Sequence, residues 1–152
     1  MLNAVVASSA EIELEPSPIP QEWILDGAPE ARSKHIASSS GGAMTMVVWS
    51  CTTGMFRWQY LVDEMVHILS GEVFIVDHVG TQRRFGPGDV AFFPAGSWSV
   101  WRVTEDVRKV AVLNVPVPRL VCLSLQIWHR VCRAVRVRSF MPAGTKAAPL
   151  PN

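Results

Sequence analysis

Side chains that could bind or act on a small molecule gather in the sequence just before Glu64. Arg57, Trp58, Gln59 and Tyr60 precede this carboxylate by four to seven residues. An arginine can hold a ligand carboxylate through two parallel hydrogen bonds. A carboxylate that packs against aromatic rings is a candidate proton acceptor. We therefore take Glu64 and Tyr60 as candidate catalytic residues.

The stretch that must position these residues, 54–96, has the pattern of consecutive antiparallel strands. Its apolar segments at 65–69, 73–77 and 90–93 are too short for helices and rich in Val, Ile and Phe. Glycine and proline separate them and predict turns, because glycine adopts positive φ without steric cost. The predicted breaks are at Ser70-Gly71, Val79-Gly80, Gly86-Pro87-Gly88 and Pro94-Ala95-Gly96.

Further alternating segments extend this pattern on both sides. Residues 44–51, 55–60, 97–103 and 107–115 each predict a strand. Roughly eight strands at this spacing favour an all-β barrel or double sheet. Residues 26–42 are polar and turn-rich, and we expect a connecting loop there with at most a short strand. The Ser-Gly run within it predicts a flexible linker more than an anion-binding loop.

Two motifs in this region resemble those of the cupin family. Glu64, six residues and Gly71 resemble the second half of the first cupin motif. Gly88, five residues and Pro94-Ala95-Gly96 resemble the second motif. The segments SCTTGMFRWQYLVDEMVHILSGEV, FGPGDVAFFPAGSWSVW and VRKVAV are similar to single-domain cupins related to (S)-ureidoglycine aminohydrolase. The resemblance implies a small RmlC-like jelly-roll β-barrel over residues 23–118.

In that fold the strands that carry the candidate residues are neighbours, so the resemblance implies a ligand site at the barrel mouth. Such sites are mainly apolar and aromatic, with a few placed polar groups. The expected ligand is a small polar or carboxylated metabolite. The alternative that some of the tryptophans only fill the core stays open. The ligand-binding candidates are Arg57, Trp58, Gln59, Trp49, Trp98, Ser99 and Trp101.

The resemblance also raises the question of a metal. Metal-binding cupins supply two histidines and a glutamate from the first motif and a histidine from the second, and they hold Mn, Fe, Ni or Zn. Here Glu64 stands at the glutamate position and is a candidate metal ligand, but residues 57–60 and Ser99 replace the histidines. His67 follows Glu64 by three residues, so we expect it on the opposite face of its strand.

Two functions of different classes are compatible with these observations. The resemblance implies a metal-dependent C–N hydrolase related to (S)-ureidoglycine aminohydrolase. The alternative is a non-catalytic binding or homodimeric assembly module with a degenerate metal site, because open sheet edges must be covered or paired. Whether the protein is an enzyme stays open at this point.

The ends of the chain differ from its centre. Residues 1–22 hold three prolines in five positions and predict an N-terminal arm. Residues 119–138 have a helical apolar stripe with arginines, which predicts a basic amphipathic helix, and a disordered tail follows to 152. These basic residues lack a nucleic-acid-binding motif, so we expect no such partner. The chain has no apolar run long enough for a transmembrane span and no basic leader, which favours a cytoplasmic location.

Overall fold

The computed structural model describes residues 11–116, which belong to the first of the two units into which the chain divides, Met1–Pro116. The predicted basic helix and tail lie outside the described residues, as do the first ten residues of the predicted arm. Within 11–116, no helix is long and apolar enough to cross a membrane. The described residues are strand-rich and contain no α-helix, which confirms the all-β prediction.

Nine strands and one short 3-10 turn make up the regular structure of the described residues. They are β1 (Glu15–Pro16), η1 (Gln21–Trp23), β2 (Ile24–Asp26), β3 (Ala31–Ser38), β4 (Met44–Cys51), β5 (Gly54–Gln59), β6 (Asp63–Asp77), β7 (Gln82–Phe85), β8 (Val90–Phe93) and β9 (Trp98–Asn114).

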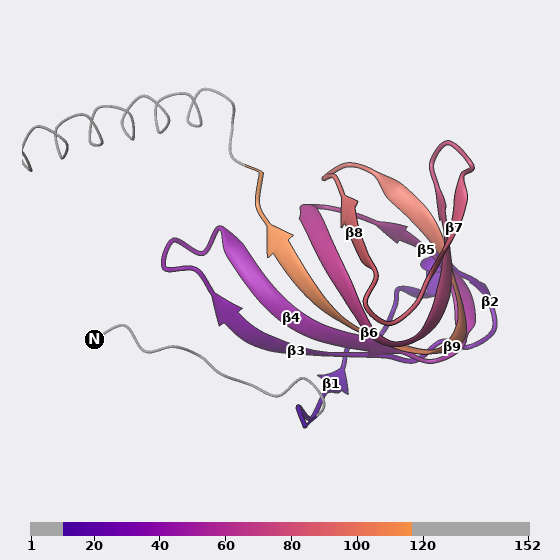
Figure 1. The fold of residues 1–152 in the computed structure, drawn as a ribbon, viewed down its shortest axis with the longest axis horizontal. Coiled ribbons are helices and arrows are strands. Elements are labelled where there is room, and N and C mark those ends of the chain that lie inside the picture. The colour runs from indigo at the N-terminus through magenta and orange to yellow at the C-terminus, as the bar shows by residue number, and fades with distance from the viewer. Residues whose placement is uncertain (1–10, 117–152) are drawn as a thin grey trace, which may run out of the picture. The chain divides into compact units, whose positions relative to one another are not determined.

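The two longest strands, β6 and β9, pair with each other along nearly their whole length. Residues 107–114 of β9 also pair with β4, and residues 98–103 pair with β5. The free edge of β6 pairs with β8 near its start and with β7 near its end. The β6–β9 pair therefore joins two groups of strands into one sheet, which curls into a half-barrel (Figure 1).

The concave face of this sheet holds the hydrophobic core. Alternation along β9, and along β6 on each side of its bulged bend, turns alternate side chains toward it. Aromatic and β-branched residues dominate the buried cluster, as the sequence pattern predicts. Its members are Ile19, Ala31, Trp49, Cys51, Phe56, Ile68, Val73, Ile75, Trp101, Val103 and Val107.

The predicted turn at Ser70-Gly71 is wrong, because β6 continues through it. The register against β9 shifts three times between Ile68 and Val73, which identifies a bulged bend instead of a hairpin. Gly71 has φ +81°, and a Cβ there would lie 2.1 Å from the backbone oxygen of Asp106. The predicted break between residues 103 and 107 is wrong for the same reason. Both strands bend together and remain paired.

The expectation of a loop over residues 26–42 is also corrected. Ala31–Ser38 forms the eight-residue strand β3, which pairs with β4 along its length. β1, from the predicted arm, pairs with the other edge of β3. Most β3 side chains are only half-buried or exposed, so polar residues are tolerated there. The Ser-Gly run forms the hairpin turn, where the amide of Gly42 donates to the carbonyl of Ser39 at 2.8 Å.

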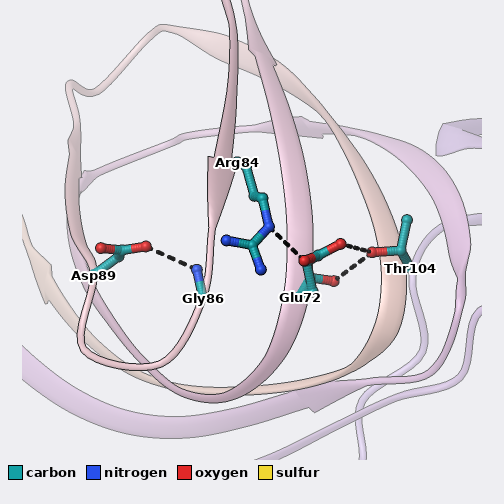
Figure 2. A network of polar contacts seen from close by, with 5 residues as sticks. All are labelled: Glu72, Arg84, Gly86, Asp89 and Thr104. Carbon is teal, nitrogen blue, oxygen red and sulfur yellow. Dashed lines mark hydrogen bonds and ion pairs between the residues drawn. The ribbon is translucent and has the colours of Figure 1, made fainter.

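Polar side chains brace the strands near the bend (Figure 2). Arg84 of β7 forms an ion pair with Glu72 of β6, and the hydroxyl of Thr104 in β9 donates to the same carboxylate at 2.9 Å. The hydrogen bonds from Arg84 and Thr104 lower the pKa of Glu72. Asp89 accepts the amide of Gly86 at 2.8 Å and closes the predicted turn before β8.

We expect Gly71→Ala to lower the free energy of unfolding by about 2–5 kcal/mol, because it adds both a positive-φ penalty and a clash with the β9 backbone. Gly80→Ala is the matched control, since Gly80 has φ +88° but no atom within 4 Å of the place that an added Cβ would take. That control should cost only about 1–2 kcal/mol. Urea denaturation measures both, and equal losses would contradict the role of the bend.

Candidate functional site

An ion pair lies inside the half-barrel, between β6 and β9. Glu64 is only 6% exposed and Lys109 only 3%. The Lys109 Nζ donates a hydrogen bond to Glu64 Oε1 at 2.6 Å. Both residues lie on the core face of their strands. Glu64 is two residues from the buried Val66, and Lys109 is two residues from the buried Ala111. Strand geometry therefore forces both charges inward.

Aromatic rings surround the ammonium group of Lys109. Its Nζ lies 4.8 Å from the ring centroid of Trp49 and 4.4 Å from that of Trp101. The faces of indole rings attract cations, and more strongly where water is excluded. The lysine charge is therefore balanced by one carboxylate and two rings.

A second polar group lies beside the ion pair. The hydroxyls of Tyr60 and Ser99 share a hydrogen bond of 2.7 Å, and both are 1% exposed. The indole Nε1 of Trp101 donates to the Tyr60 hydroxyl at 2.9 Å and to the Ser99 hydroxyl at 3.1 Å. Burial raises the pKa of Tyr60, and the negative charge of Glu64 adds to the increase. Tyr60 therefore stays protonated at neutral pH.

Ring packing fills the space around these polar groups. The ring of Trp49 contacts those of Phe56, Trp58 and Trp101 edge-on, with centroids 6.1–6.3 Å apart. Tyr60 stacks on Phe93 with a centroid distance of 4.4 Å. Edge-to-face and offset arrangements of this kind are favourable ring contacts. This closed cluster of Glu64, Lys109, Tyr60, Ser99 and Trp101 with their aromatic neighbours is thus solidly packed.

The predicted site residues divide between the two faces of the sheet. Those on the concave face are Trp49, Trp58, Tyr60, Glu64, Ser99 and Trp101. The others are Arg57, Gln59 and Trp98. Alternation along β5 turns Arg57 and Gln59 away from the core, and Gln59 pairs with Trp98. The Arg57 guanidinium carbon lies 4.0 Å from the Trp98 ring centroid, so these residues contact each other outside the closed cluster.

Sequence reasoning missed Lys109, which is the direct partner of Glu64. A lysine is usually expected at the surface. The signal that could have found it is its position in VRKVAV, where it alternates in phase with Val107 and Ala111. His67 is exposed on the other face from Glu64, as its spacing predicts.

An open groove of about 440 Å³ adjoins the closed cluster. Ile75 and Arg83 are directly opposed in the β6–β7 ladder, so both face the concave side. Two residues line both the groove and the closed cluster. Ser99 belongs to the cluster, and Phe93 stacks on the Tyr60 ring of the cluster. The other residues that line the groove are Asp77, His78, Thr81, Phe85, Val90, Ala91, Phe92, Pro94, Ser97 and Trp98.

Residues 38–111 match the family model described as the EutQ-like cupin domain. The chain contains a cupin domain. Within this cupin domain, the first motif, from Glu64 to Gly71, lies on β6. The second motif, from Gly88 to Gly96, consists of β8 and the turns on either side of it. No protein of curated function matches the chain.

Solved structures support the cupin fold. A protein of unknown function of the DUF861 family from Pseudomonas syringae pv. tomato is 22% identical, with a TM-score of 0.63, over 68% of this chain and 45% of its own. A predicted oxalate decarboxylase from Thermotoga maritima is 20% identical, with a TM-score of 0.57, over 73% and 99%. A putative ethanolamine utilization protein Q from Salmonella typhimurium is 23% identical, with a TM-score of 0.50, over 56% and 69%. The chain spans less than half the length of the Pseudomonas protein, and these identities show the fold alone.

The residues of this cupin domain do not fit a transition-metal site. Glu64, which stands at the glutamate position, is bonded to the Lys109 ammonium. Trp58 and Tyr60 reach the interior with aromatic rings, and Ser99 there is hydrogen-bonded to Tyr60. Among residues 11–116, no three His, Cys, Asp or Glu side chains come together as a metal site would require.

The one cysteine of the described range, Cys51, is buried in the core. Burial raises the pKa of its thiol to about 12. A thiol is nucleophilic as the thiolate, so Cys51 is a structural residue.

We expect Lys109→Met to lower the free energy of unfolding by about 3–5 kcal/mol, because it leaves the Glu64 carboxylate buried without its partner. Adding Glu64→Gln to this variant should restore most of that loss, since an amide costs much less to bury than a lone charge. Urea denaturation of both single variants and the double variant measures the coupling. Additive losses would contradict a tight buried pair.

Proposed function

We propose that this cupin domain is a non-catalytic binding module that holds a small polar or carboxylated metabolite in the open groove without a bound metal. The observation that carries the proposal is the hydrogen bond between Lys109 and Glu64, with an open groove beside it. The ammonium group supplies inside the barrel the positive charge that a metal would otherwise bring.

The pairing of the interior polar groups favours binding over C–N hydrolysis. A general base must reach the proton that it removes, directly or through one water. Glu64 is engaged by Lys109, and Tyr60 by Ser99 and Trp101. Among the described residues, every deeply buried side-chain nitrogen and oxygen has a hydrogen-bond partner. These groups therefore support a structural role for the closed cluster.

The groove has the properties of a small-molecule site. Its volume of about 440 Å³ falls in the range typical of ligand pockets. Apolar side chains such as Phe85 and Phe93 line it together with the charged groups of Asp77 and Arg83. Such a lining suits a metabolite that has both an apolar body and a charged end.

The homodimer expected from the sequence stays a prediction. Met65, Val90 and Phe92 are all more than half exposed, and the β6–β8 ladder places Met65 opposite Phe92. A second copy would pack on this apolar surface, at the edge of the groove that Val90 and Phe92 also line, and sedimentation equilibrium decides whether one does.

We expect the metal-stripped protein to bind its ligand as well as the untreated protein does. A thermal-shift panel of small carboxylic and amino acids, run with and without a chelator, measures this. A compound present at about 100 times its Kd should stabilise the protein by about 2.7 kcal/mol under both conditions.

Ala91→Trp, which fills the groove, should abolish the shift, whereas Ala43→Trp in the exposed β3–β4 turn should keep it. Binding or hydrolysis that requires a divalent metal and is lost in Glu64→Gln would overturn the proposal.

A further inference from the structure

One wall of the groove carries two opposite charges that do not neutralise each other. Ile75 is opposite Arg83 in the β6–β7 ladder, and Asp77 lies two residues further along β6 on the same face. Diagonal neighbours of this kind have Cα atoms about 7–8 Å apart. Among the ion pairs of residues 11–116, none joins Arg83 to Asp77 or to another carboxylate.

Arg84 shows the contrast on the same strand. Its guanidinium is engaged by Glu72, which Thr104 also binds, so it is committed to bracing the strands (Figure 2). Alternation turns the neighbouring Arg83 to the other face, where it lines the groove. Arg83 is therefore available to a ligand, and its planar fork matches a carboxylate.

Only one of the two carboxylate oxygens of Asp77 accepts hydrogen bonds from the described residues. Its Oδ1 accepts the backbone amides of Val79 at 3.0 Å and Thr81 at 2.9 Å, which holds the β6–β7 turn in place. These two bonds fix the orientation of the carboxylate. Its Oδ2 makes no hydrogen bond within the described part of the chain, and Asp77 lines the groove.

We propose, as a refinement that rests on the proposed function, that the groove selects a zwitterionic α-amino acid with an apolar side chain. Arg83 holds the carboxylate of the ligand, and Asp77 Oδ2 accepts its ammonium group. The apolar side chain lies against Ile75, Phe85 and Phe93, which line the same groove. The requirement for both charges comes from two opposite charges on adjacent strands that form no ion pair with each other.

Isothermal titration of the full chain tests this with three probes of similar shape. L-leucine carries both charges, L-leucinamide only the ammonium and 4-methylpentanoate only the carboxylate. We expect L-leucine to bind at least about tenfold more tightly than either of the others, because each loses one charge-assisted hydrogen bond.

Two variants remove one charge each. Asp77→Asn keeps the oxygen that holds the turn and should weaken L-leucine binding about tenfold to a hundredfold while leaving 4-methylpentanoate binding unchanged. Arg83→Gln should weaken the binding of both L-leucine and 4-methylpentanoate. Arg84→Gln is the matched control and should leave all affinities unchanged.

The inference is overturned if 4-methylpentanoate binds as tightly as L-leucine, or if Asp77→Asn leaves the affinity for L-leucine unchanged. In either case the proposed function stands if Ala91→Trp abolishes the binding, because the ligand then occupies the groove. The inference is also overturned if none of the three probes binds. The carboxylic-acid panel with Ala91→Trp then decides the proposed function separately.

Discussion

A lysine and a glutamate that are buried together must satisfy each other, because either charge alone would be costly away from water. Glu64 and Lys109 meet this condition through one hydrogen bond and two ring faces. Their meeting depends on the register of β6 against β9, since a slip by one residue would turn one of them outward. A buried ion pair contributes little net stability compared with apolar residues of the same size. We therefore regard this pair chiefly as a constraint on the register of β6 against β9 and on which other charged groups the interior can hold.

The interior of the half-barrel has two parts, the closed cluster and the open groove, and they have different roles. The closed cluster is polar at its centre and aromatic around it, and its polar atoms bind one another. The groove lies on the other side of Phe93 and Ser99, where β7 and β8 pair with different ends of β6 and leave room between them. The bend at Gly71 lets one long strand serve both parts, because β6 supplies Glu64 before the bend and Ile75 and Asp77 after it. Recognition of a ligand therefore falls to the groove, while the closed cluster holds its wall in place.

Much of this fold could be predicted from alternation and turn residues, and the exceptions have physical reasons. A glycine at positive φ serves a bulged bend as well as a hairpin, so Gly71 alone could not distinguish them. β3 is polar because most of its side chains are at least partly exposed, and its sequence therefore resembles a loop. Glu64 was correctly expected to face inward, but its partner Lys109 was missed because a cation is rarely buried. Arg57 and Gln59 were grouped with Trp58, although alternation along β5 places them on the opposite face.

The most direct test of the account is a crystal structure of the protein grown with excess Mn²⁺ or Zn²⁺, with anomalous diffraction recorded at the absorption edge of the metal. We predict no anomalous peak beside Glu64, and the Lys109 ammonium within hydrogen-bond distance of its carboxylate. A peak about 2.0–2.2 Å from a Glu64 oxygen, with Lys109 turned away, would contradict the claim that the lysine takes the place of a metal.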